Sequence, residues 1–377
     1  MRSRFVSPGL SSEEAALRSF DALCGAFYAR LLAQPTASAL ESALLELDPD
    51  FELLSLASGP SGLCLDVRSD LVKRPLLERF QNAAPHGVDV VIERGPRSFE
   101  AACSCAAELG VDLKQARVRA GITRGHLLEL LVYVPPSKGR LPDETEAAVE
   151  LFVETCLGER VVDDWIKSID VAPLVGQGPL RLVQPDATQT AGFHLSELKA
   201  ALDCTVQGIH AQLPERPLCQ MPERDDWVML EAEPGQARAR QADLVYASTC
   251  LPEMLKCFLE DAPFASVRFS RHAEHFAYLK YADAGQPEAR VRARQLLEDR
   301  VDRALRELAL GAVVGNGIGQ HHSYIDLALG DVDRALGVLK HAAQACSLPT
   351  ASWLLFCDTV WQLEWVGLRP QTEPPER

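Results

Sequence analysis

Apolar residues recur at three- and four-residue intervals near the start of the chain. Residues 13–33 place them on one face of a helix, and the stretch Ser11-Ser12-Glu13-Glu14 is a typical helix start. A second helix is predicted over residues 37–47. We therefore expect residues 1–37 to form an N-terminal helical segment that leads into the rest of the fold.

Two apolar runs that follow, residues 51–56 and 63–67, have the length of strands. The turn-forming stretch Gly59-Pro60-Ser61-Gly62 lies between them, so the pair predicts a β-hairpin.

Two segments far apart in the chain repeat one pattern. A helix over residues 76–85 ends in Ala-Pro and leads to a strand at 88–92, while a helix over 254–263 ends in Ala-Pro and leads to a strand at 265–269. A second repeated pattern is strand, helix, strand, at residues 127–134, 144–156 and the region of Val161, and again at 324–329, 332–345 and 352–356. Helices commonly end near proline, but two correspondences in the same order favour an internal duplication.

The duplication predicts two related halves, at residues 38–175 and 226–377. Residues 176–225 lie between them, with a short helix expected near residues 195–202 and a proline-rich passage from Pro214 to Pro222. Such a composition is typical of a connector.

The second half has the clearer pattern. Residues 286–309 predict a long helix with one apolar stripe, made of Val291, Leu296, Leu297, Val301, Ala304, Leu305 and Leu308, and with charged residues such as Arg294 outside it. The other elements expected there are strands at 228–233, 265–280 and 352–358 and helices at 251–260 and 332–345. Short links between strands mixed with helical crossovers indicate an α+β fold of two two-layer sandwich halves, ferredoxin-like or elaborated, with mainly antiparallel sheets and helices on one face.

Composition and charge limit the classes of partner. The chain has 377 residues, 47% apolar and 24% charged, without a long uncharged apolar run or a signal-peptide pattern, so a cytoplasmic protein of bacterial type is expected. The formal charge of −15 disfavours nucleic acid and anionic membrane surfaces and favours a basic protein partner. The 11 cysteines have mostly apolar neighbours and are expected to be free thiols, and no cofactor is expected.

Glycine density is highest at Gly315-Asn316-Gly317-Ile318-Gly319. Asn316-Gly317 is the dipeptide that favours a type I′ hairpin turn, so we predict a structural turn at Asn316 and Gly317. The run does not fit a dinucleotide-binding fingerprint, because Gln320 stands where a third glycine of that motif is needed and a strand pattern follows.

The candidates for a metal site are His321, His322 and Asp326, which follow this run, and His275, which lies on a strand expected to be their neighbour. Imidazole and carboxylate ligands suit zinc or iron. However, His321 and His322 are adjacent, and adjacent residues point to opposite sides of a regular strand. Solvated or core-satisfied histidines are the alternative.

Aromatic residues near the C-terminus are the candidates for partner binding. Trp361 and Trp365, with Glu364 between them and Tyr324 earlier in the chain, are residue types found at protein interfaces, although tryptophans also fill cores beside a sheet. The close pair Cys103 and Cys105 has no recognisable base to activate a thiol.

Two functions of different classes follow from these patterns. The first is a non-catalytic protein-binding protein, of the immunity or adaptor kind, that neutralises a basic partner by charge complementarity. The second is a metal-dependent hydrolase or isomerase that uses the His321/His322 region. The sequence favours the first, because no complete catalytic set accompanies the histidines.

Overall fold

The fold is α+β, as the sequence predicts. The computed structural model describes residues 11–33, 37–48, 51–56, 62–66, 71–135, 142–174, 192–222, 227–231, 240–259 and 262–375. The chain divides into two compact units, one formed by Met1–Ile92 with Leu213–Arg377 and the other by Glu93–Gln212. This division differs from the expected halves, because residues 93–175 of the first half and most of the expected connector belong to the inserted unit.

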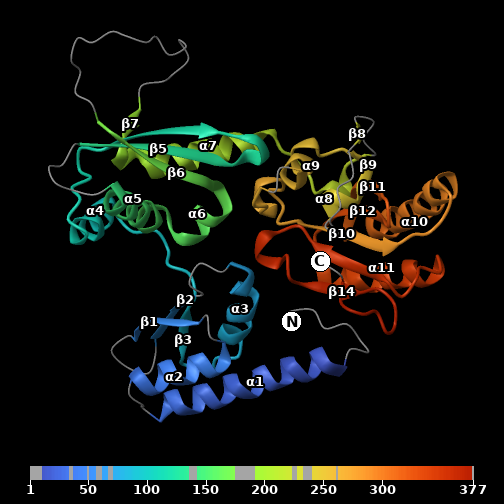
Figure 1. Cartoon of the computed structure of the whole chain (residues 1–377), viewed down its shortest axis with the longest axis horizontal. Helices are drawn as coiled ribbons and strands as arrows, with labels where there is room; N and C mark the ends of the chain where they lie inside the picture. The colour runs from blue at the N-terminus through green and yellow to red at the C-terminus, as the bar shows by residue number, and fades with distance from the viewer. Residues whose placement is uncertain are drawn as a thin grey trace, which may run out of the picture. The chain divides into compact units, whose positions relative to one another are not determined.

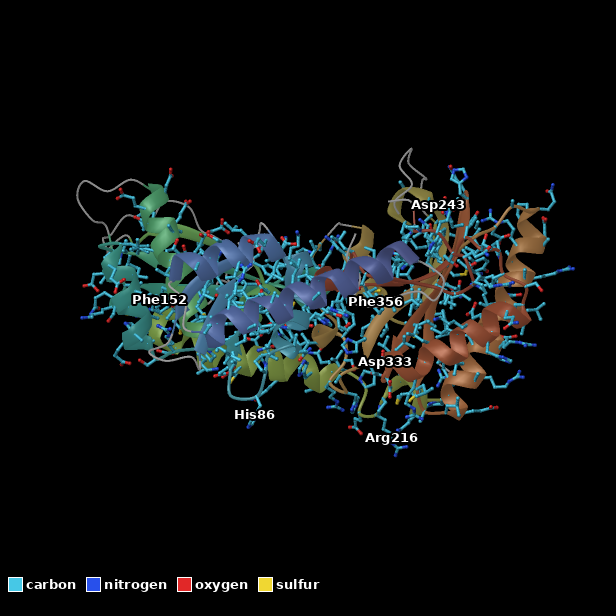
Figure 2. All side chains as sticks on the ribbon, turned by 90° about the horizontal axis from the view of Figure 1, so that it is seen from below. His86, Phe152, Arg216, Asp243, Asp333 and Phe356 are labelled. Carbon is cyan, nitrogen blue, oxygen red and sulfur yellow. The ribbon has the colours of Figure 1, made fainter. Side chains whose placement is uncertain are left out.

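The inserted unit contains a four-stranded sheet in the order β6-β5-β4-β7, in which β5 and β6 are parallel. Its core gathers around Phe152, Val132 and Leu130, and Figure 2 labels Phe152 among the side chains of this unit. In chain order its helices and strands are α4 (Phe99–Glu108), β4 (Arg117–Ile122), β5 (Leu128–Val134), α5 (Pro142–Leu157), α6 (Glu159–Trp165), β6 (Ile166–Pro173), β7 (Phe193–His194) and α7 (Leu198–Gln212).

The N-terminal part of the other unit packs three helices against a three-stranded sheet. The predicted hairpin is confirmed, since β1 and β2 are antiparallel, and β3 adds parallel to β2. Phe27, Phe51 and Phe80 meet in its core at ring-centroid distances of 5.1 Å and 6.3 Å from Phe80. The elements are α1 (Ser11–Leu32), α2 (Ala37–Leu47), β1 (Glu52–Leu56), β2 (Gly62–Asp66), α3 (Arg74–Asn82) and β3 (Asp89–Val91).

The C-terminal part carries a seven-stranded, fully antiparallel sheet in the order β14-β13-β10-β12-β11-β9-β8 (Figure 1). Its elements are β8 (Val228–Glu231), α8 (Arg240–Asp243), β9 (Leu244–Thr249), α9 (Pro252–Leu259), β10 (His275–Ala282), α10 (Pro287–Glu307), β11 (Gly311–Gly319), β12 (His322–Leu329), α11 (Val332–Ala345), β13 (Ser352–Phe356) and β14 (Trp365–Gly367). Short 3-10 helices join them, at η4 (Leu218–Gln220), η5 (Ser266–Arg268) and η6 (Thr359–Trp361), and further ones lie at η1 (Leu71–Lys73), η2 (Arg124–His126) and η3 (Leu195–Glu197).

Helices cover both faces of this sheet, whereas the sequence led us to expect them on one. Alternate residues of β12 show the two faces. Ile325 and Leu327 pack against α10 and α11 in a core that also contains Phe356 (Figure 2). Tyr324 and Ala328 pack on the opposite side of the sheet, in clusters that contain residues of α9. β12 is therefore buried on both faces, with Asp326 as a charged residue on the face of Tyr324 and Ala328.

The first repeated pattern is not kept in the structure. α3 is followed by strand β3, but α9 is followed by the 3-10 helix η5. Ser266 donates from its backbone N–H and its hydroxyl to the two oxygens of Asp358, at 2.6 and 2.5 Å, and its hydroxyl accepts the backbone N–H of Phe276 in β10 at 3.0 Å. Side-chain hydrogen bonds, and not strand pairing, therefore hold this segment. Residues 76–92 and 254–269 thus occupy unrelated places.

The second repeated pattern keeps the same order of elements in the structure, but its strands are paired differently in the two places. Strand, helix and strand recur as β5, α5, β6 and as β12, α11, β13. β5 and β6 are direct parallel neighbours, whereas β10 lies between β12 and β13. The prediction of a strand near Val161 is wrong, since that residue lies in α6. In this helix Arg160 pairs with Asp164, one turn later, at 2.7 Å.

The stripe predicted for α10 is correct in its centre and wrong at two positions. Leu297, Val301 and Leu305 are buried, but Leu296 is 69% exposed and Leu308 is 53% exposed. Arg290 and Arg294 complete the buried face instead. The Arg290 guanidinium lies 3.4 Å from Asp283 and donates to the carbonyl oxygen of His322 at 3.1 Å, so polar partners replace the expected apolar contact.

Two further features bear on the sequence expectations. All 11 cysteines are free in the structure. Among the described residues, no helix has the length and apolar character needed to cross a membrane.

Candidate functional site

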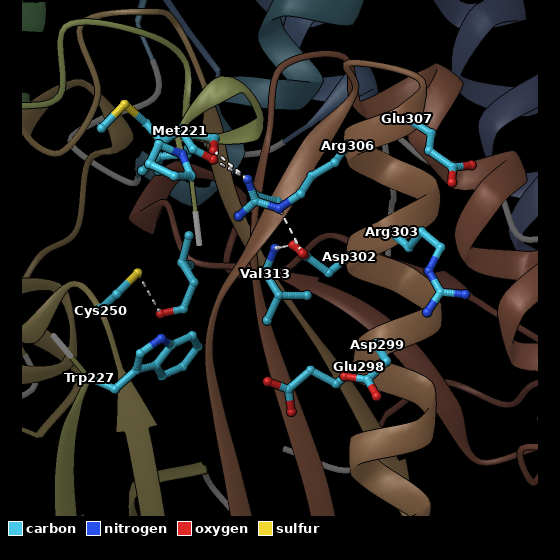
Figure 3. A pocket seen from close by; sticks show the side chains of 14 residues that line it. Met221, Trp227, Cys250, Glu298, Asp299, Asp302, Arg303, Arg306, Glu307 and Val313 are labelled. Atoms are coloured by element: carbon cyan, nitrogen blue, oxygen red, sulfur yellow. Dashed lines mark hydrogen bonds and ion pairs between the residues drawn. The ribbon is translucent and has the colours of Figure 1, made fainter. Parts of the chain in front are cut away.

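A cleft of about 460 Å³ lies between α10, the start of β11 and the residue that precedes β8. Trp227 lies on one side of it, and the acidic residues of α10 lie on the other (Figure 3). We call it the Trp227 cleft. Its lining residues are Leu218, Met221, Pro222, Trp227, Cys250, Glu298, Asp299, Asp302, Arg303, Arg306, Glu307, Ala312, Val313 and Val314.

The floor of the cleft is fixed by Asp302 and Arg306, one turn apart on α10. One Asp302 oxygen accepts the backbone N–H of Val313 at 2.8 Å, and the other accepts Arg306 Nε at 2.7 Å. Arg306 Nη1 donates to the carbonyl oxygens of Leu218 and Met221, at 3.1 and 2.7 Å (Figure 3). The pair thus joins helix, strand and η4, and both charges are used within the protein.

Glu298 extends the cleft toward Asn316. Its carboxylate accepts Arg294 Nη1 at 2.9 Å and Asn316 Nδ2 at 3.1 Å, and Asn316 in turn accepts the Ser248 hydroxyl at 3.0 Å. Burial raises the pKa of Glu298, while Arg294 and Asn316 oppose that change. A neighbouring hollow lined by Trp227, Glu298, Asp299 and Asn316 among others continues the cleft on this side.

The rim supplies the charges that are free to meet a ligand. Asp299, Arg303 and Glu307 line the cleft and are exposed, and their side chains form no hydrogen bond or ion pair with another described residue. Asp302 is paired to Arg306 and Glu298 to Arg294. The unpaired charges that α10 presents to the cleft are therefore two carboxylates and one guanidinium. An aromatic ring opposite carboxylates is suited to a cationic group.

The predicted turn at Asn316 and Gly317 is wrong. Both residues lie inside β11, where Asn316 pairs with Ile325 of β12 and with Ser248 of β9. β11 ends at Gly319, and Gln320 and His321 make the connection to β12. Neither residue has a positive φ. The glycines of this strand serve another purpose.

Alternate glycines of β11 make room for α8 on one face of the strand. A Cβ on Gly315 would lie 2.6 Å from an oxygen of Asp326, and a Cβ on Gly319 would lie 2.0 Å from an oxygen of Asp243. A Cβ on Gly317 would meet the side chain of Leu244 in β9, at 2.6 Å. Since alternate residues point to one face, these three glycines clear the space that Asp326, Leu244 and Asp243 fill.

Asp243 at the end of α8 is a buried acceptor for the connection between β11 and β12. Its carboxylate accepts the backbone N–H groups of His321 and His322, at 2.8 and 3.2 Å, and the Tyr324 hydroxyl at 2.7 Å; His322 Nδ1 lies 3.3 Å away. Burial by itself would raise the pKa of Asp243, but the hydrogen bonds from His322, Tyr324 and His321 hold it well below its usual range.

Arg240, at the start of α8, forms a buried ion pair with Asp326. Arg240 Nη2 lies 2.6 and 2.8 Å from the two oxygens of Asp326, and both side chains are almost fully buried. The guanidinium also lies 4.6 to 5.3 Å from the ring centroids of Tyr278, Phe258 and Tyr324. Three aromatic faces therefore surround a charge whose other nitrogens, Nε and Nη1, lack a hydrogen-bond partner among the described residues.

The four residues predicted as metal ligands are not brought together as a metal set. His275 stacks on Trp361 at 4.7 Å, Asp326 pairs with Arg240, His322 contacts Asp243, and His321 is exposed. Within the described ranges, no group of three or more His, Cys, Asp or Glu residues could hold a metal ion. Asp326 and Asp243 are instead engaged in the cluster around α8.

The side chains predicted for partner binding are buried. Trp365 and Tyr324 are completely enclosed, and Trp361 and Glu364 are exposed by 8% and 3%. Tyr324 belongs to the cluster around Asp243 and Arg240, and Trp361 packs on Phe356 at 5.2 Å. These residues fill the core, which is the alternative that the sequence left open.

Sequence reasoning missed the Trp227 cleft. Trp227 is separated by more than 70 residues from Asp299, and the spacing of charges on α10 is that of any solvated helix. The only local signal was the group Glu298, Asp299 and Asp302 beside the apolar stripe, with one- and four-residue spacing.

We expect acid to destabilise the unit that contains Asp243. A lowered pKa means that the native carboxyl binds a proton less tightly than the unfolded one, so this group stabilises the fold above its unfolded pKa, and that contribution is lost as the pH falls through the folded pKa. Wild type should lose on the order of 2 kcal/mol of unfolding free energy through this group as the pH falls below about 4.

Urea unfolding of wild type and Asp243→Asn at a series of pH values measures this loss. The variant should be less stable near neutral pH, and the gap should narrow in acid. A gap that stays constant with pH would contradict the assignment.

Comparison with known proteins gives no family for this chain: no protein-family model, curated protein or solved structure matches it.

Proposed function

We propose that this chain is a non-catalytic, cytoplasmic binding protein that takes a basic side chain of a protein partner into the Trp227 cleft. The observation that carries the proposal is the position of Trp227 opposite the carboxylates of α10 across an open cleft (Figure 3). Its volume of about 460 Å³ is in the range of pockets that enclose a small group. An immunity or adaptor role would use this kind of contact.

Charge supports the same proposal. The chain carries a formal charge of −15, so its summed field attracts a basic protein over a distance and speeds encounter. At the cleft itself, Asp299 and Glu307 can pair with an arriving lysine or arginine without breaking an ion pair within the protein. The indole of Trp227 adds the attraction of a ring face for a cation.

The test uses short peptides as probes. A hexa-arginine peptide is expected to bind with a dissociation constant that rises at least tenfold in the Asp299→Asn/Glu307→Gln variant, which corresponds to about 1.4 kcal/mol. Trp227→Leu should weaken binding too, whereas Trp227→Phe keeps a ring and should retain most of it. Titration calorimetry at two salt concentrations measures these constants.

The matched control is Glu108→Gln/Glu197→Gln, which removes two exposed carboxylates from the inserted unit. It changes net charge by the same amount and should leave peptide affinity nearly unchanged. If the control weakens binding as much as the cleft variant does, attraction is general and the cleft has no role. Hexaglutamate should not bind.

A further inference from the structure

A second cavity, of about 470 Å³, lies between α11 and the segment that follows β14, and it has the opposite electrostatic character from the Trp227 cleft. Lys340, His341 and Arg369 line it, and no carboxylate does. Its lining residues are Gly337, Lys340, His341, Gln344, Gly367, Leu368, Arg369 and Pro370. The formal charge of the whole chain is −15, so the basic lining of this cavity is a local exception to the charge of the protein.

One wall is a single face of α11. Gly337, Lys340, His341 and Gln344 are spaced by three, one and three residues, so they lie along one side of the helix. Lys340 is half-buried, and its ammonium group forms no hydrogen bond or ion pair with another described residue. Its burial lowers the pKa of the ammonium group, and no carboxylate is among the residues that line the cavity.

The other wall is held rigidly. Arg369 Nη1 donates to the carbonyl oxygens of Leu348 and Ala343, at 2.8 and 3.4 Å, and Thr372 closes the turn by hydrogen bonds to the Arg369 backbone at 2.7 and 3.2 Å. Arg369 Nε is buried and lacks a partner among the described residues. A guanidinium fixed in this way is prepared to meet an anion with little loss of entropy.

Gly337 supplies an independent observation. Glycine inside a helix costs about 1 kcal/mol relative to alanine. A Cβ placed on Gly337 would meet nothing within 4 Å, so packing does not require glycine there. Gly337 is one of the residues that line the cavity, so its lack of a side chain leaves more room at this wall.

We propose that this cavity binds a small organic oxyanion, a phosphate or carboxylate carried on a compact apolar body. Lys340 and Arg369 would meet the oxyanion, and Leu368, Pro370 and the glycine backbone would contact the body. The volume favours a body in addition to the anion, because one water occupies only about 30 Å³ of liquid. This binding is independent of the Trp227 cleft.

The test titrates wild type with phenyl phosphate, benzoate, inorganic phosphate and phenol by calorimetry. Phenyl phosphate or benzoate should bind with a submillimolar dissociation constant, and the stronger of the two identifies the oxyanion. Inorganic phosphate should bind more weakly, and uncharged phenol should not bind. Failure of both organic anions to bind at millimolar concentration would overturn the proposal.

Two variants locate the binding. Lys340→Met should weaken it at least tenfold, and Gly337→Leu should abolish it by filling the cavity. Gly208→Leu is the matched control, because Gly208 is an exposed glycine inside α7 that does not line this cavity, and a Cβ placed on it would also meet nothing within 4 Å. Thermal unfolding confirms that each variant folds. If Gly337→Leu binds the anion as wild type does, the site lies elsewhere.

Discussion

Replacing Gly319 by alanine should lower the free energy of unfolding by about 3–5 kcal/mol. The new Cβ would lie 2.0 Å from one Asp243 oxygen, 2.5 Å from its Cγ and 2.7 Å from its backbone oxygen. Asp243 cannot move away cheaply, since its carboxylate is held by the His321 and His322 amides and by the Tyr324 hydroxyl. The substitution therefore either strains β11 or breaks these charged hydrogen bonds.

Two further glycine variants make the measurement specific. Gly317→Ala should cost less than Gly319→Ala, because its shortest contact, 2.6 Å, is to the end of the Leu244 side chain, which can rotate. Gly121→Ala is the matched control, since this strand glycine has open space where a Cβ would stand. Urea unfolding of the three variants should rank them in that order of cost. Equal losses at all three positions would mean that strand glycines matter for another reason.

Breaking the buried ion pair should have an effect of similar size. Arg240→Met is expected to lower the free energy of unfolding by about 3–5 kcal/mol, because it leaves Asp326 buried without its counter-charge. Burial already raises the pKa of Asp326 against the opposing effect of Arg240, so removal of the guanidinium should raise that pKa further. Denaturant unfolding at neutral pH measures the loss.

The double variant Arg240→Met/Asp326→Leu distinguishes the effect of an unpaired buried charge from the effect of lost side-chain packing. With both charges removed, the aromatic surroundings of Tyr278, Phe258 and Tyr324 can hold an apolar side chain, and much of the lost stability should return. The exposed pair of Lys199 and Asp203 is the control, and its removal should cost less than about 1 kcal/mol. A double variant as unstable as Arg240→Met would show that the pair acts through something other than its charges.

The sequence predicted most helices and strands because their periodicity reports burial. Helices α1, α2 and α11 and the hairpin of β1 and β2 lie within a few residues of their predicted positions. The predicted stripe on α10 omits two residues that are buried, Arg290 and Arg294. They pair with the carboxylates of Asp283 and Glu298, and a pattern of apolar residues does not show that an arginine can be buried beside such a partner.

The glycine run shows the same limit at the candidate site. Asn316-Gly317 has the composition of a turn, but β11 continues through it because β9 and β12 pair with it on both sides. The space that side chains would need is occupied by Asp326 of β12 and by Leu244 and Asp243, which lie far earlier in the chain. Local patterns predicted that this region was unusual and could not predict which element it accommodates.

The interruption of one unit by the other has a consequence for synthesis on the ribosome. The N-terminal helices and three-stranded sheet emerge first, but the seven-stranded sheet of the same unit is complete only after residues 93–212 have been made. The inserted unit has all its strands on a continuous stretch, so it can fold while its host is still unfinished. The entropy of joining the distant parts of the host grows slowly, by about 0.6 kcal/mol for each doubling of the intervening length. The delay before the host can be completed is therefore a larger cost of this chain order than the entropy of joining its parts.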